Sequence, residues 1–241
     1  MSRVLLTGIG SGLGQALAAA CLDRGDDVLA LSRRLPEEWA DHERVRFERV
    51  DLSRPDDIRP AIEALLADGS APDLVILNAG VLGETKDLRD SSMEEIDAVM
   101  NVNVWANKRL FDALLDLDAA PRQLVAISSG AAFLGSGGWG AYCVSKSALN
   151  LLFRVYAKEH PDVHITCLAP GLVWTPMLAT ALRREDPEIP DDPRYEAIGR
   201  LREAKGTDAM QTPAGAAARI LELLPRVLDL ESGAYADIRE L

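Results

Sequence analysis

Histidine, cysteine and aromatic residues are scarce in this 241-residue chain, which holds three histidines, three cysteines and 5% Phe, Trp and Tyr. The cysteines are odd in number and widely separated, so neither a disulfide framework nor a cysteine-based zinc site is expected. His42, His160 and His164 fall in unrelated segments and indicate no histidine-based catalytic triad. The sequence therefore predicts reduced thiols and no metal site.

Long hydrophobic runs and an excess of basic charge are also missing. No apolar stretch approaches the roughly 20 residues that span a bilayer, and no signal-peptide core follows the first methionine. With 38 acidic and 26 basic residues the formal net charge is −12, which disfavours nucleic acid or an anionic membrane as the main partner. We expect a soluble, cytoplasmic protein that binds neither nucleic acid nor membrane.

The chain does contain a regular alternation of apolar runs and helical patterns, with 48% hydrophobic residues to build a core. The predicted strands are Val4–Thr7, Val28–Ser32, Val45–Val50, Leu74–Leu77, Leu124–Ser128, Val163–Leu168 and Tyr235–Ile238. The predicted helices are 12–24, 55–67, 92–117, 141–159 and 213–228. This alternation predicts a doubly wound, Rossmann-like α/β fold, a parallel sheet of about seven strands flanked by helices on both faces. Because no repeat or linker divides the chain, we predict a single domain over residues 1–241.

The segment 177–211 breaks this alternation, because it is polar and rich in proline, above all at 186–193. It follows the sixth predicted strand, and open α/β sheets bind their ligands at the carboxyl ends of the strands. We therefore predict that 177–211 is an insertion that acts as a substrate lid. The alternative is a solvated surface loop.

The first predicted strand is joined to the first helix by a glycine-rich turn, T-G-I-G-S-G-L-G at 7–14. Backbone N–H groups and the helix N-terminus in such a turn can hold a pyrophosphate. The strict G-x-G-x-x-G pattern fails at Leu13, whereas the spacing G-x-x-x-G-x-G fits Gly8, Gly12 and Gly14. A tight turn alone would not need three glycines, so the turn predicts dinucleotide binding.

Tyr142 and Lys146 are four residues apart in a predicted helix and therefore share one face. At ~4 Å and an effective dielectric of about 20, the lysine charge stabilises a tyrosinate by roughly 4 kcal/mol. That would lower the phenol pKa by up to about 3 units, so that Tyr142 exchanges protons near neutrality. The spacing alone is common, and a solvated helix face is the alternative.

Further motifs follow in order: Asn78-Ala79-Gly80 after the fourth strand, Ser129 thirteen residues before Tyr142, and Pro170-Gly171 with Thr175 after the sixth strand. Together with the glycine turn and the Tyr142/Lys146 pair, they resemble the short-chain dehydrogenase/reductase family over essentially the whole chain. The resemblance implies an oxidoreductase that acts between an alcohol and a carbonyl group.

The resemblance also implies a role for each of four residues. Tyr142 would exchange a proton with the reacting oxygen, and Lys146 would lower the pKa of Tyr142 and bind the nicotinamide ribose. Ser129 would polarise the carbonyl group, and Asn103 would position a water in a proton relay. Two neighbours are rivals for these positions and are disfavoured by spacing: Asn101 for Asn103, and Ser128 for Ser129.

The end of the second strand predicts the cofactor. An acidic residue there would bind the adenine-ribose hydroxyls and repel a 2′-phosphate. The chain has Ser32 and Arg33 instead, and a hydroxyl next to a guanidinium suits a phosphate, so we predict NADP(H). The alternative is that Arg33 and Arg34 are exposed loop charges. The residues expected to contact the cofactor are Gly8, Gly10, Ser11, Gly12, Leu13, Gly14, Ser32, Arg33, Asp51, Leu52, Asn78, Ala79, Gly80, Tyr142, Lys146, Pro170, Gly171, Val173 and Thr175.

Stretches such as Gly138-Trp139-Gly140 and 232–237 resemble the sepiapterin reductase and benzil reductase branch of the family. The resemblance implies an NADPH-dependent reductase of dicarbonyl compounds or of a pterin side-chain ketone. In that branch the aspartate at the position of Asp237 would hold the pterin, although an aspartate in the last strand is often structural. The expected substrate contacts are Ser129, Tyr142, Trp139, Trp174, Met177 and Asp237. The two tryptophans and Met177 have core or lid packing as their alternative role.

Other functions stay open at this point: a 3-oxoacyl thioester reductase, a secondary-alcohol dehydrogenase, or a non-catalytic NADP-binding sensor. The complete set of Asn103, Ser129, Tyr142 and Lys146 argues against a sensor, which has no need of all four. We expect a small-molecule carbonyl substrate and a homodimer or homotetramer.

Overall fold

The computed structural model describes residues 2–183 and 195–241. Among these residues, seven parallel strands form one sheet in the order β3-β2-β1-β4-β5-β6-β7. The strands are β1 (Arg3–Thr7), β2 (Asp27–Ser32), β3 (Val45–Arg49), β4 (Leu74–Leu77), β5 (Gln123–Ile127), β6 (His164–Ala169) and β7 (Ala234–Asp237). The predicted Rossmann-like sheet is thereby confirmed, with strand boundaries that differ by at most one residue.

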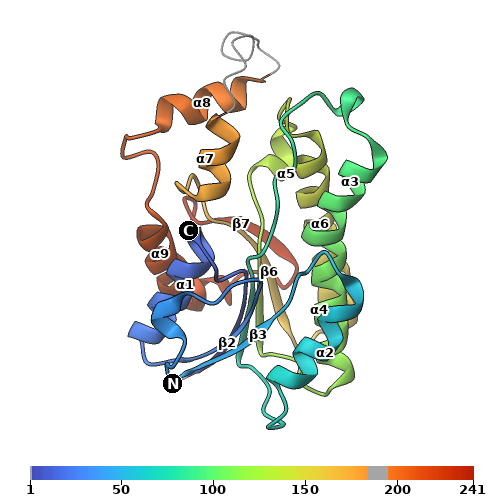
Figure 1. Cartoon of the computed structure of the whole chain (residues 1–241), viewed down its shortest axis with the longest axis vertical. Coiled ribbons are helices and arrows are strands. Elements are labelled where there is room, and N and C mark those ends of the chain that lie inside the picture. The colour runs from blue at the N-terminus through green and yellow to red at the C-terminus, as the bar shows by residue number, and fades with distance from the viewer. Residues whose placement is uncertain (1, 184–194) are drawn as a thin grey trace.

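Two helical layers cover the sheet, one on each face (Figure 1). One layer holds α1 (Gly12–Asp23) and α9 (Pro213–Val227), which pack on each other. The opposite layer holds α2 (Pro55–Leu65), α4 (Ala106–Asp116) and α6 (Gly140–Glu159). The remaining helices are α3 (Met93–Met100), α5 (Ala131–Leu134), α7 (Pro176–Arg183), α8 (Glu196–Ala204) and the short η1 (Glu37–Trp39), η2 (Leu88–Asp90) and η3 (Asn101–Trp105).

Strand β1 shows why the three residues at its centre, Val4 to Leu6, are all apolar. Leu5 packs into the cluster formed with α2, α4 and α6, whereas its neighbours Val4 and Leu6 pack into the cluster formed with α1 and α9. Successive side chains of a strand point to opposite faces, and here both faces are covered by helices. All three side chains are fully buried.

Local capping explains where two helices begin. The Thr212 hydroxyl accepts a hydrogen bond from Gly215 N at 3.1 Å, and Pro213 occupies the first turn of α9. Helix α3 begins with a capping box, in which Ser92 and Glu95 bond each other's backbone N–H.

The predicted helix 92–117 forms one unbroken helical run, 93–116, but its turns are not uniform. It consists of α3, the five-residue π-helix η3 and α4. Asn103 lies inside η3, and its backbone oxygen accepts a hydrogen bond of 2.8 Å from Asn107 Nδ2. The wide turn accompanies contacts of the Asn103 side chain with the loop after β4. The spacing of apolar residues along the helix gives no information about such contacts.

Helices α7 and α8 lie beyond the carboxyl ends of the strands, at the top of Figure 1. They form much of the predicted segment 177–211, which is therefore more helical than its composition indicated; residues 184–194, including the acidic and proline-rich stretch, lie outside the described residues. Ile198 and Leu201 of α8 pack against Trp139 and Cys143 in a small third cluster. In the described part of the chain, no helix has the length and apolar character needed to cross a membrane.

Candidate active site

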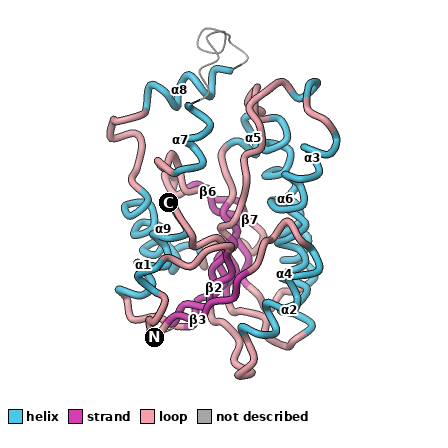
Figure 2. Tube along the Cα trace, in the orientation of Figure 1, coloured by secondary structure: helices cyan, strands magenta, loops and turns pink. Residues whose placement is uncertain are grey.

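A cavity of about 730 Å³ opens at the carboxyl ends of the strands. In Figure 2, loops gather between the sheet and the helices α5, α7 and α8. All nineteen residues predicted to contact the cofactor line this cavity, although they come from segments between Gly8 and Thr175. Ser129, Trp139, Met177 and Asp237 line it too, whereas Asn103 and Trp174 do not.

The glycine turn leaves no space for side chains. Gly8 has a φ of +76°, and a Cβ at Gly14 would lie 2.1 Å from the Gly8 carbonyl oxygen. A Cβ at Gly12 would also fall in a left-handed conformation, with a φ of +60°. The turn therefore brings the backbone close to the cavity and aims the start of α1 at it, which suits a pyrophosphate group.

Asn78 braces this turn from the end of β4. Its side-chain Nδ2 donates to the carbonyl oxygens of Thr7 at 3.1 Å and of Gly8 at 3.3 Å. In return, the Thr7 hydroxyl accepts hydrogen bonds of 3.0 Å from the backbone N–H groups of Asn78 and Ala79. Asn78 thus lines the cavity and also holds the turns after β1 and β4 together.

The end of β2 presents a hydroxyl and two cations to the cavity. Ser32 is buried, whereas Arg33 and Arg34 are exposed, and all three line the cavity. Hydrogen bonds from the Ser53 backbone and side chain, with a smaller contribution from the Arg33 charge, lower the pKa of Asp51. Neither arginine makes a salt bridge within the described ranges, so both guanidinium groups can bind a ligand.

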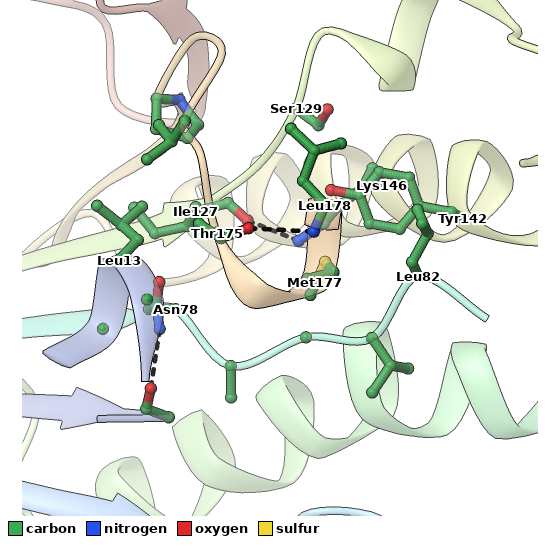
Figure 3. A pocket seen from close by; sticks show the side chains of 18 of the residues that line it. Leu13, Asn78, Leu82, Ile127, Ser129, Tyr142, Lys146, Thr175, Met177 and Leu178 are labelled. Atoms are coloured by element: carbon green, nitrogen blue, oxygen red, sulfur yellow. Dashed lines mark hydrogen bonds between the residues drawn. The ribbon is translucent and has the colours of Figure 1, made fainter. Parts of the chain in front are cut away.

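Tyr142, Lys146 and Ser129 lie together in the same cavity (Figure 3). The ammonium nitrogen of Lys146 lies 5.7 Å from the centre of the Tyr142 ring and donates to the Ile127 carbonyl oxygen at 2.7 Å. A hydrogen bond joins the Ser129 and Tyr142 side chains. An ammonium group has three N–H donors, so two of those on Lys146 stay available.

The pKa shifts in the protein without ligand differ from the sequence prediction. Burial raises the pKa of Tyr142 to about 12, and the hydrogen bond with Ser129 opposes this only in part. Burial also lowers the pKa of Lys146 to about 8, because a charged amine loses its hydration. The predicted lowering of the tyrosine pKa is therefore wrong for this state, because burial of the Tyr142 hydroxyl raises its pKa. The spacing of Tyr142 and Lys146 in the sequence does not show how deeply either side chain is buried, so the effect of burial on the tyrosine pKa could not be predicted.

Asn103 holds the loop after β4 with its side chain. Its Oδ1 accepts from Val81 N at 2.8 Å, and its Nδ2 donates to Val81 O at 2.8 Å and to Ser145 Oγ at 2.9 Å. Asn103 is fully buried, and a Cβ on Gly80 would lie 3.2 Å from its Oδ1 and 3.7 Å from the Lys146 nitrogen. This places Asn103 directly behind the cavity wall. Its role in a water relay stays a prediction.

The rival serine has a structural partner. The Ser128 hydroxyl donates to Asn150 Oδ1 at 2.7 Å in a buried contact, whereas the Ser129 hydroxyl lies in the cavity with Tyr142. This arrangement favours Ser129 as the residue that contacts a substrate.

The predicted substrate contacts divide into two groups. Trp139 is buried in the cavity wall, with its indole N–H donating to the Thr85 hydroxyl at 3.3 Å, and Met177 is 39% exposed at the cavity. Trp174 is not among the residues that line the cavity; it packs against the third cluster, with the Lys205 ammonium 4.9 Å from its ring centre. A tryptophan in this loop could face the cavity or pack against α8, and the sequence alone does not distinguish these two orientations.

Asp237 is 4% exposed, and its carboxylate is already occupied. Its Oδ1 accepts from the backbone N–H of Arg239 at 3.0 Å and from Arg239 Nε at 2.8 Å, while Oδ2 accepts from Arg239 Nη2 at 2.6 Å. These bonds lower the pKa of Asp237. A carboxylate offers about four acceptor positions, so Arg239 fills most of them.

The sequence and the fold of this chain are similar to those of known oxidoreductases. Residues 2–186 match the family described as short chain dehydrogenase. The chain belongs to this family. Benzil reductase ((S)-benzoin forming) of Bacillus subtilis is 28% identical, with 100% of this chain and 99% of the relative aligned. Sepiapterin reductase of Xenopus laevis is 34% identical over 77% of this chain and 79% of the relative. The crystal structure of the KRED1-Pglu enzyme has a TM-score of 0.86 at 26% identity and covers 98% of this chain and 100% of its own.

Membership of the short chain dehydrogenase family makes the protein an NAD(P)-dependent oxidoreductase that acts on small molecules. The residues fit the cofactor, because Gly8, Gly10 and Gly12 line the cavity without side chains just before and at the start of α1, where a pyrophosphate can approach the backbone. In the described ranges, no group of three or more His, Cys, Asp or Glu side chains is placed to hold a metal ion.

The cavity also contains residues that sequence analysis missed. Among them are Val81, Leu82, Ala98, Val102, Leu178, Ala197, Arg200, Leu201 and Arg239. Most are apolar side chains without any recognisable motif. Only Arg239 could have been suspected from the sequence, because it lies two residues after Asp237, which was itself an expected substrate contact.

Proposed function

We propose that the protein is an NADPH-dependent carbonyl reductase that acts on dicarbonyl compounds. The observation that carries this proposal is the meeting of Tyr142, Ser129 and Lys146 in the cavity that the glycine turn also lines. A proton donor, a polarising hydroxyl and a buried cation next to a dinucleotide turn suit reduction of a carbonyl group.

The residues of the chain would divide the work as follows. When bound, the nicotinamide supplies a hydride to the carbonyl carbon. Tyr142 gives its hydroxyl proton to the carbonyl oxygen, and Ser129 donates a hydrogen bond to the same oxygen. Lys146 keeps one N–H on the Ile127 carbonyl and uses the others for the cofactor ribose and for the negative charge that forms on Tyr142.

The preference for NADPH rests on the end of β2. Ser32 and Arg33 line the cavity, no acidic residue takes their place, and Arg33 is exposed and able to reach a 2′-phosphate. A guanidinium that binds a phosphate forms charge-assisted hydrogen bonds, which are stronger than those between neutral groups.

The substrate proposal rests on the relatives and on the cavity wall. Benzil, whose reductase aligns along the whole chain, is a bulky dicarbonyl compound. Apolar side chains of Trp139, Leu134 and Met177 line the cavity beside Ser129, which suits a substrate with flat, apolar parts. A 3-oxoacyl thioester or a secondary alcohol remains the alternative substrate for the same residues.

Two further expectations belong to this proposal. Helices α7 and α8 line the cavity with Met177, Leu178, Ala197, Arg200 and Leu201, so we propose that 177–211 acts as the substrate lid. We also propose a homo-oligomer. Val144, Leu151 and Val155 lie on one face of α6 and are 49%, 60% and 45% exposed, which is typical of a surface that another copy covers. Light scattering combined with size exclusion tests the oligomer.

The function is tested by following NADPH oxidation with benzil, sepiapterin, isatin and an acetoacetyl thioester, with product analysis for each. We expect turnover of benzil or isatin and slower turnover of the thioester. A protein that binds NADPH but reduces none of the four would contradict the proposed function and would favour a binding role. Efficient reduction of the thioester alone would favour the alternative substrate.

A further inference from the structure

Arg239 lies in the cavity on the side away from the predicted 2′-phosphate position. It follows β7, the edge strand next to β6, and β5 with Ser129 at its end comes next in the sheet. Ser32 and Arg33 follow β2, on the other side of the glycine turn after β1. Along the carboxyl edge of the sheet, Arg239 therefore lies beyond the reacting centre, where a substrate would extend.

The Asp237 carboxylate holds the Arg239 side chain in one orientation. Nε and Nη2 of Arg239 both bond this buried carboxylate, while the arginine side chain itself is 60% exposed. A guanidinium has five N–H groups, so three remain after these two bonds. Within residues 2–183 and 195–241, none of these three forms a further hydrogen bond.

Gly171 gives the arginine room to lie in the cavity wall. A Cβ on Gly171 would lie 3.5 Å from Arg239 Cδ and 3.0 Å from Gln211 Nε2. Both Gly171 and Arg239 line the cavity. A held guanidinium binds an oxygen acceptor with less loss of side-chain freedom than a mobile one does.

The charges on this side of the cavity favour an anion. Arg200 of α8 also lines the cavity, and its contact with Glu196 is long, at 3.6 Å, and exposed on both sides. Of the residues that the structure describes, two acidic ones line the cavity, and one of them, Asp51, follows β3 at the far edge of the sheet. The other is Asp237, which Arg239 already neutralises.

We propose that Arg239 selects substrates that carry a carboxylate or a similar oxyanion in addition to the carbonyl group that is reduced. This rests on the proposed function and names the substrate class of the same site. The three free N–H groups of Arg239 bind the anion, and Arg200 adds a second positive charge when the lid lies over the cavity. The anion is unchanged by the reaction. The carbonyl carbon gains a hydride from the reduced cofactor, its oxygen gains the Tyr142 proton, and the product is a hydroxy acid.

The test compares acids with their uncharged esters. Benzoylformate and 4-acetylbenzoate place the carboxylate near to and far from the ketone, and the methyl ester of each removes the charge. We expect at least one acid to have a higher kcat/KM than its ester. Arg239→Gln should lower kcat/KM for that acid roughly 10- to 150-fold, the loss of one charged hydrogen bond, and change the ester about threefold at most.

Two further variants control for folding and for general charge. Arg239→Gln leaves Asp237 buried without its partner, so the double variant Asp237→Asn, Arg239→Gln replaces both charges by amides and should show the same selective loss. Arg226→Gln removes an exposed arginine of α9 outside the cavity and should leave every rate unchanged. Equal losses on acid and ester, or a preference for the ester in the parent, would overturn the inference.

Different experimental results would overturn the anion site and the proposed reductase function. Reduction of benzil or of the esters without reduction of either acid would overturn the anion site and leave the carbonyl reductase standing. If no ketone is reduced, calorimetry with mandelate still decides the anion site. Weaker binding to the double variant than to the parent supports the site, and equal or absent binding overturns it.

Discussion

The ammonium group of Lys146 donates a hydrogen bond of 2.7 Å to the carbonyl oxygen of Ile127, the last residue of β5. The helix that carries Tyr142 is thereby tied to the strand that leads into Ser129. The same contact keeps a lysine that is only 4% exposed close to the reacting centre.

This burial predicts an unusual dependence of stability on pH. The pKa of Lys146 is lowered from 10.5 to about 8 in the folded protein, so folding releases a proton in the window between these values. The cost of burying the charge is fully present below about pH 8 and is relieved as the pH rises through the window. Relative to Lys146→Met, the parent should gain up to about 3 kcal/mol of unfolding free energy between about pH 8 and 10.5. Urea unfolding of both proteins across this range measures the difference, and parallel pH curves would contradict the shift.

Ser145 links Asn103 to the backbone of Tyr142, because it accepts from Asn103 and donates to Tyr142 O at 2.7 Å. Ser145→Ala leaves one amide N–H of Asn103 without a partner, so we expect a loss of about 1–3 kcal/mol in stability. We also expect a lower kcat with little change in the KM for NADPH. Ser147→Ala removes a comparable hydroxyl, which bonds Ala132 O, and serves as the matched control. The same kcat loss in both variants would show that Ser145 acts only through stability.

Tyr142→Phe should remove reductase activity and keep NADPH binding, because it deletes the transferable proton and leaves the cofactor turn intact. Tyr156→Phe is its control, since this tyrosine lies on the same helix with its hydroxyl on Asp112, outside the cavity. Steady-state rates and a fluorescence titration with NADPH provide the two readings. Substantial activity in the Tyr142 variant would refute the proposed proton donor.

Arg33→Ala should lower kcat/KM for NADPH roughly 10- to 150-fold and leave the value for NADH nearly unchanged. The expected loss is that of a charged hydrogen bond to the 2′-phosphate. Arg49→Ala, at the exposed end of neighbouring β3 and outside the cavity, removes a nearby charge and should affect neither cofactor. If Arg33→Ala affects both cofactors equally, the 2′-phosphate assignment is wrong.

The lid proposal predicts protection of α7 and α8 from hydrogen exchange when NADPH and a substrate analogue bind. The amides of α9, which packs on α1 and does not line the cavity, should exchange at the same rate with and without ligand. Slow exchange of α7 and α8 in the free protein, unchanged by ligand, would mean that the two helices are a fixed wall of the cavity.

Much of the fold could be predicted, because strand β1 and its neighbours carry apolar side chains on both faces and glycine must follow β1. Leu5 and Leu6 are fully buried on opposite faces of the sheet, and a Cβ at position 14 would collide with the Gly8 carbonyl oxygen. The gathering of the expected cofactor contacts in one cavity was predictable for the same reason, since they follow the ends of successive strands.

The unpredicted features depend on contacts between segments that are distant in sequence or on the direction of a single side chain. The π-helix holds Asn103 in contact with Val81, and Trp174 packs against the third cluster without lining the cavity. The raised pKa of Tyr142 follows from burial, which spacing to Lys146 does not contain. Asp237 and Arg239 pair because the chain turns directly after β7.

The π-helix η3 makes the position of Asn103 a matter of chain length as well as of residue identity. An α-helix advances about 100° per residue, and a π-turn accommodates one residue more than a regular turn would. Deleting a single residue between Asn101 and Trp105 would let α3 and α4 run on as one regular helix and would rotate the asparagine away from Val81. A substitution leaves the wide turn in place. A relative that lacks one residue in this stretch would therefore be expected to hold its asparagine in a different position, even if the asparagine itself is retained.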